Sequence, residues 1–129
     1  MRRVLGWSTL GGGLLVVLFW ALYYAGAISL GREPEAAAFE AAFPVADAAL
    51  AAVLLFAGRE LLRGGAAGPL ALGAAAAMTL YLGLLDATFY GRAGLYARIS
   101  AGALPLVASN LLCLSGGVAG LWFSWRLSR

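Results

Sequence analysis

The sequence predicts an all-α membrane protein, an antiparallel bundle of four transmembrane helices with a short interfacial helix between the first two. Hydrophobic residues make up 63% of its 129 residues, and the mean hydropathy is +0.89, far above that of soluble domains. Charged residues make up only 12% and cluster between long uncharged runs. We therefore expect a single integral membrane domain over residues 1–129, with spans at about 4–30, 43–62, 66–90 and 101–125.

The first expected span begins close to the N-terminus. Its uncharged run extends from Val4 to Gly31, which is longer than the roughly 20 residues needed to cross the hydrocarbon core. Arg2 and Arg3 before an apolar run also fit a signal peptide, but this run is longer than a usual signal-peptide core, so we favour a span.

The segment 32–42 carries the acidic residues of the first loop and predicts the interfacial helix. Pro34 fits the first position of such a helix. Phe39 and Phe43 are four residues apart, so they would share the face that enters the membrane boundary.

The second expected span has the shortest uncharged centre, because Asp47 lies near one end and Arg59 and Glu60 near the other. Long arginine stems can reach back to the interface, which keeps a span of this length feasible. The third and fourth spans are longer uncharged runs. The fourth ends in Trp122 and Trp125, which are typical of an interfacial anchor.

The arginines predict that both termini are cytoplasmic. Arg2, Arg3, Arg59, Arg63, Arg126 and Arg129 would lie on one side, and Arg32, Arg92 and Arg98 on the other. The more basic side faces the cytoplasm. The composition, rich in Ala, Gly and Arg with no Lys or His, suggests a bacterial genome of high GC content, so we expect the bacterial inner (cytoplasmic) membrane. The basic residues flank apolar segments, so nucleic acid is not an expected partner.

Small residues predict close helix contacts. Gly116 and Gly120 form a GxxxG pair, Gly73 and Ala77 a similar pair, and the run 11–13 consists of glycine. Such pairs join helices within one chain or between chains. A homo-oligomer and a larger membrane complex therefore both remain open.

The missing residue types exclude several chemistries. Without histidine there is no histidine-bound haem or zinc and no imidazole base, and without lysine there is no Schiff base. The single cysteine, Cys113, can form no internal disulfide. We therefore expect no metal and no cofactor, and we identify no residue as catalytic.

Two aspartates near the outer face define the candidate site. Asp47 lies four residues inside the second span and Asp86 four residues before the end of the third, so both would lie roughly 6 Å below the outer boundary. An acid within a span is costly and usually faces a cavity or a partner. Further candidates for ligand or proton binding near this level are Tyr23, Tyr24, Tyr90, Asn110, Ser109 and Arg92.

Each aspartate also has a structural interpretation. Asp47 follows Pro44 near the start of a helix, where the helix dipole stabilises a carboxylate. Asp86 lies near the end of a helix, where the dipole opposes its charge, so it needs a partner, and Arg92 or Arg98 could pair with it. If the two acids instead meet, their repulsion favours protonation of one and creates a proton site.

Three functions follow from these features. We expect first a non-enzymatic membrane protein that binds a small apolar or cationic ligand, a lipid or a proton in a carboxylate-lined pocket. The first alternative is a membrane-embedded enzyme that uses the two carboxylates as acid and base on a lipid-like substrate. The second is an accessory or structural subunit of a larger membrane complex.

Overall fold

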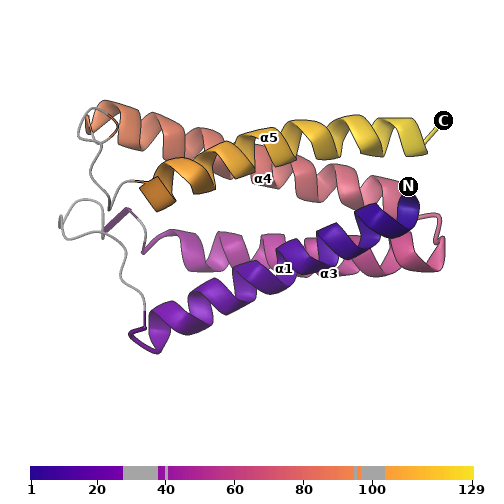
Figure 1. The fold of residues 1–129 in the computed structure, drawn as a ribbon, viewed down its shortest axis with the longest axis horizontal. Coiled ribbons are helices and arrows are strands. Elements are labelled where there is room, and N and C mark those ends of the chain that lie inside the picture. Colours follow the sequence, from indigo (N-terminus) through magenta and orange to yellow (C-terminus); the bar gives the residue numbers. More distant parts are fainter. Residues whose placement is uncertain (28–37, 40, 95, 97–103) are drawn as a thin grey trace. The chain divides into compact units, whose positions relative to one another are not determined.

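The computed structural model describes residues 1–27, 38–39, 41–94, 96 and 104–129, and all of the regular secondary structure among them is helical. Four long helices follow one another: α1 (Arg2–Tyr24), α3 (Phe43–Arg63), α4 (Gly68–Arg92) and α5 (Leu104–Leu127) (Figure 1). The predicted interfacial helix at 32–42 falls largely outside the described residues. Phe39 of this segment packs against Phe43, the first residue of α3, with ring centroids 4.9 Å apart.

Three of the helices are long and apolar enough to span a membrane: Arg2–Tyr24, Gly68–Arg92 and Val107–Leu127. These three helices confirm the prediction of a helical membrane protein with several transmembrane helices. Helix α3 has 21 residues, but charged residues lie near both of its ends, and it is not one of the three candidate spans. Its crossing of the membrane stays a prediction.

Left-handed glycines mark where the helices stop. Helix α1 ends at Tyr24, well before the end of its apolar run, and Gly26 follows with φ +72°. Helix α3 ends at Arg63, and its C-cap Gly64 has φ +70°. There the N–H of Gly65 donates to the carbonyl of Glu60 at 2.8 Å, which satisfies one of the last helical carbonyls.

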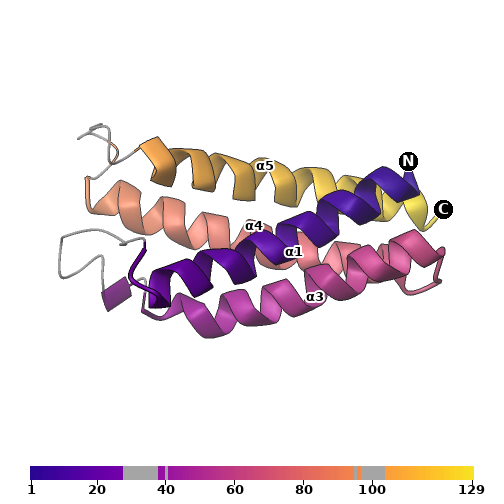
Figure 2. The same ribbon diagram turned by 60° about the horizontal axis from the view of Figure 1, so that its bottom comes forward.

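The chain divides into two compact units, Met1–Ala71 and Leu72–Arg129. The first unit is built on α1 and α3, which lie side by side (Figures 1 and 2). A Cβ added at Gly6 would lie 2.7 Å from Leu62 Cγ, and one added at Gly13 would lie 3.0 Å from Leu55 Cγ. As residue numbers rise along α1, those of its contacts in α3 fall, so the two helices run in opposite directions.

The second unit pairs most of α4 with α5 by the same kind of contact. A Cβ at Gly83 would lie 2.8 Å from Cys113 Cβ, one at Gly117 would lie 2.7 Å from Leu80 Cβ, and one at Gly120 would lie 2.7 Å from Ala76 Cβ. These approaches are possible only for glycine, and they are the usual way in which helices pack when lipid surrounds them.

The glycine patterns in the sequence identified the right helices but not all the right positions. Nothing lies within 4 Å of a Cβ placed at Gly11, Gly12 or Gly116. The contacts are made by their neighbours Gly13 and Gly117 instead.

Candidate functional site

Asp47 is held between the two helices of the first unit. The indole Nε1–H of Trp20 in α1 donates a hydrogen bond of 2.8 Å to Asp47 Oδ2 in α3. Trp20 is 8% exposed, and Asp47 is half-buried. A carboxylate among apolar helices is costly unless a donor meets it, and the indole N–H likewise needs an acceptor when it is buried. Each group therefore satisfies the other.

Helix capping does not explain Asp47. Helix α3 begins at Phe43, and its first turn contains no acidic residue. The N-cap is Ala42, whose side chain makes no capping hydrogen bond. The described hydrogen bond of Asp47 goes to the neighbouring helix, which makes the residue a link between α1 and α3.

Aromatic rings surround the donor. Trp20 packs edge-on against Phe19 and Tyr23, each at a centroid distance of 5.3 Å, and lies 6.1 Å from Tyr24. Tyr23 and Tyr24 also contact each other at 5.4 Å. These contacts restrict the indole ring, and so they help to keep its N–H directed at the carboxylate.

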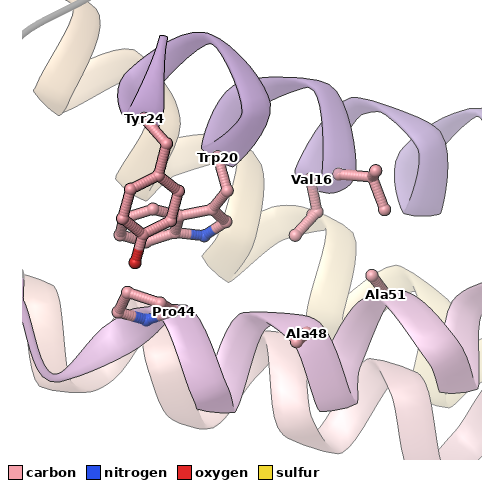
Figure 3. Close-up of a pocket in the computed structure, with 7 residues that line it drawn as sticks. Val16, Trp20, Tyr24, Pro44, Ala48 and Ala51 are labelled. Atoms are coloured by element: carbon pink, nitrogen blue, oxygen red, sulfur yellow. The ribbon is translucent and has the colours of Figure 1, made fainter. Parts of the chain in front are cut away.

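An apolar groove lies between α1 and α3 beside this hydrogen bond (Figure 3). Its volume is about 250 Å³, and it is open on one side. The lining residues are Val16, Val17, Trp20 and Tyr24 from α1, and Pro44, Ala48 and Ala51 from α3.

The size of one side chain accounts for the groove. Gly6, Gly13 and Trp20 recur at intervals of seven residues, and all three are buried. The two glycines let the helices touch, whereas the indole holds them apart at the third position. Because Ala48 and Ala51 are too small to fill the space that results, an opening remains.

The second unit has its own polar cluster, at Asn110 of α5. Asn110 is 4% exposed, and its Nδ2 donates to the hydroxyl of Tyr96. Its Oδ1 is buried and accepts no hydrogen bond from the described residues. Tyr96 packs against Tyr90, which is 3% exposed, with ring centroids 6.4 Å apart.

The register of α4 and α5 places Asp86 at the level of Asn110. Contacts join Leu80 to Gly117 and Gly83 to Cys113, so the next helical turn brings Asp86 opposite Asn110. Asp86 is half-buried, and its Oδ1 is buried. This unit therefore holds a carboxylate, an amide and two phenols near one end of its helix pair.

The predicted site residues divide between the units. Asp47, Tyr23 and Tyr24 belong to the first unit, whereas Asp86, Tyr90, Asn110, Ser109 and Arg92 belong to the second. Within its unit, each aspartate lies near predicted aromatic or amide residues. A cavity shared by Asp47 and Asp86 would need residues of both units, so it stays a prediction. Ser109 and Arg92 are exposed on their helices.

Sequence reasoning missed Trp20 and Tyr96, the hydrogen-bond partners of Asp47 and Asn110. Trp20 carried a usable signal, because its spacing from Gly6 and Gly13 places it on the packed face of α1. Tyr96 lies outside the four long helices, so no long helical periodicity points to its partner.

Metal binding has no support among the residues described: no group of three or more His, Cys, Asp or Glu side chains lies together there. The fold and the polar residues inside it define the class, an all-helical protein with at least three helices suited to a membrane. Comparisons with protein-family models, curated proteins and solved structures found no match.

Proposed function

We propose that this chain is a four-span protein of the bacterial inner membrane, with both termini in the cytoplasm, that binds a small apolar or cationic ligand. The observation that carries the proposal is the Asp47 carboxylate, hydrogen-bonded by Trp20 beside the apolar groove between α1 and α3. In this proposal the four helices form an antiparallel bundle, and the groove lies near the outer face.

The length and packing of α3 support its assignment as a span. Its 21 residues are about 32 Å long, enough to cross the hydrocarbon core. Its charged residues have suitable places: Asp47 is hydrogen-bonded by Trp20, and Arg59 and Arg63 lie near the end, where their stems reach the interface.

The chemistry of the groove favours a cation with an apolar body. The Trp20 indole supplies one hydrogen bond to Asp47 but no positive charge, so the indole does not compete with a cation for the carboxylate. The rings of Trp20 and Tyr24 line the same groove and offer faces to which cations are attracted. Valine, proline and alanine side chains provide the apolar contact surface.

A matched pair of probes tests this proposal. Benzyltrimethylammonium and neopentylbenzene have the same shape and differ in one positive charge. We expect calorimetry on the protein in detergent, corrected for detergent alone, to show binding of the cation at least about tenfold tighter than binding of the neutral probe, as expected for a charge-assisted contact.

The variant Asp47→Asn keeps an acceptor for the Trp20 N–H and removes the charge. We expect it to bind the two probes equally. Glu60→Gln, which removes an acid near the other end of α3, is the control and should keep the preference for the cation. If wild-type protein binds both probes equally or neither, the cation site is wrong, and Asp47 is a structural link only.

A further inference from the structure

The C-terminal end of α5 carries two arginines that stack on tryptophans. Arg126 Cζ lies 4.6 Å from the centroid of the Trp122 ring, and Arg129 Cζ lies 3.6 Å from that of Trp125. Both indoles are well exposed, at 46% and 53%, and both arginines are exposed. We call these four residues the Trp–Arg surface.

The two stacks are neighbours on the helix. Trp125 follows Trp122 by three residues, which places the two indoles roughly 60° apart around the axis of α5. Arg126 lies on the helix, and Arg129 lies two residues beyond its end. Both guanidinium groups therefore lie on neighbouring indoles at the C-terminal end of α5.

Stacking prepares the guanidinium groups to bind an anion. A guanidinium packed on a ring face loses much of its freedom, while its edge keeps several N–H donors available. The planar fork of these donors matches two oxygens of a phosphate. The described aromatic contacts of Arg126 and Arg129 use only the faces of the groups, so they leave the edges available.

The position of the surface identifies the source of the phosphate. It lies at the end of Val107–Leu127, a segment long and apolar enough to span a membrane. Tryptophan at the end of a span lies at the level of the lipid headgroups, and arginine beside it reaches the phosphates.

We propose that the Trp–Arg surface binds the phosphate of an anionic phospholipid, with the indoles against the glycerol and upper acyl region and the two guanidinium groups on the headgroup. This site lies in the second unit and does not depend on the groove beside Asp47. Zwitterionic lipid carries the same phosphate, but its headgroup ammonium offsets the negative charge beside the two guanidinium groups, so we expect a preference for anionic lipid.

Native mass spectrometry tests the preference on the whole chain, released from nanodiscs with equal phosphatidylglycerol and phosphatidylcholine. We expect retained lipid to be enriched in phosphatidylglycerol. Replacing both arginines, Arg126→Gln with Arg129→Gln, should lower that enrichment by at least about fivefold, the contribution of one basic residue at an anionic surface. Added inorganic phosphate should not compete, because it lacks the apolar part that the indoles contact.

Two matched variants distinguish binding by stacked guanidinium groups from a general attraction of anionic lipid to positive charge. Arg59→Gln with Arg63→Gln removes the same charge from the first unit, and we expect less than a twofold change. Arg126→Lys with Arg129→Lys keeps the charge but removes the planar fork, and we expect it to lose most of the enrichment. Circular dichroism checks that each variant remains helical.

Three results would overturn the proposal. The first is equal loss in the two glutamine pairs, which would indicate an overall charge effect. The second is full enrichment in the lysine pair, which would indicate point charges without a stacked site. The third is no enrichment in the wild-type protein.

Discussion

The two units pack their helices in the same way, but they differ in the polar side chains that are hydrogen-bonded within each unit. In the first, Gly6, Gly13 and Gly58 bring α1 and α3 into contact, and in the second, Gly83 and Gly117 do the same for α4 and α5. Beyond the glycines, the first pair is joined by a charged link, Trp20 to Asp47, whereas the second contains a neutral one, Asn110 to Tyr96. The glycine packing is therefore the same in both units and does not determine their chemistry. Single polar side chains determine it.

The largest expected effect comes from blocking the close contacts. A Cβ at Gly58 would lie 2.8 Å from the backbone oxygen of Gly6, and one at Gly117 would lie 2.9 Å from Leu80 Cα. Because backbone atoms cannot move aside cheaply, Gly58→Ala and Gly117→Ala should each lower the free energy of unfolding by about 1–3 kcal/mol. Unfolding in detergent with added SDS, followed by circular dichroism, measures this.

Gly12→Ala is the control for both variants, since nothing lies within 4 Å of the added atom. It should leave the stability unchanged or raise it by up to about 1 kcal/mol through helix propensity. If Gly117→Ala were as harmless as Gly12→Ala, the two units would not share a packing rule.

The next effect concerns the charged link. Trp20→Phe removes the N–H donor and keeps a ring, while Asp47→Leu removes the acceptor and the charge. A double-mutant cycle of the two should give a coupling of about 1–2 kcal/mol, because hydrogen bonds to charged groups lie at the strong end of those in membranes. A coupling near zero would show that the two groups do not stabilise the unit together.

The smallest effect concerns the neutral link. The corresponding cycle of Asn110→Leu and Tyr96→Phe should give about 0.6 kcal/mol, the usual value between neutral groups within a bilayer. The same unfolding assay applies. A coupling larger than that of Trp20 and Asp47 would reverse the comparison between the two ends.

Hydropathy was sufficient to predict the helical class, because apolar runs of this length have few other uses. It overestimated α1, since no charge marks its end and Gly26 stops the helix through backbone conformation instead. Hydropathy also could not decide whether α3 spans, because a charge inside a span is tolerated only when a partner meets it. The partner of Asp47 is 27 residues away, in another helix.

The two carboxylates of the candidate site could be predicted from the sequence, but the hydrogen-bond donor and the groove beside Asp47 were not predicted. Aspartates in apolar runs stand out, so Asp47 and Asp86 were found. Trp20 is one aromatic residue among several in α1, and only its spacing of seven and fourteen residues from Gly13 and Gly6 distinguishes it from Phe19 in the sequence. The groove depends on the size difference between Trp20 and the glycines at the earlier positions, a property of two helices together.

The local character of the glycine contacts has a consequence for biogenesis. The close neighbours of Gly6 and Gly13 all belong to the next long helix of the chain, α3. The first pair therefore has every such neighbour once residue 63 has left the ribosome, before α5 is synthesised. In the proposed four-span topology, this pair can insert as a preassembled hairpin, with the Asp47 carboxylate already matched to its donor when it meets the lipid.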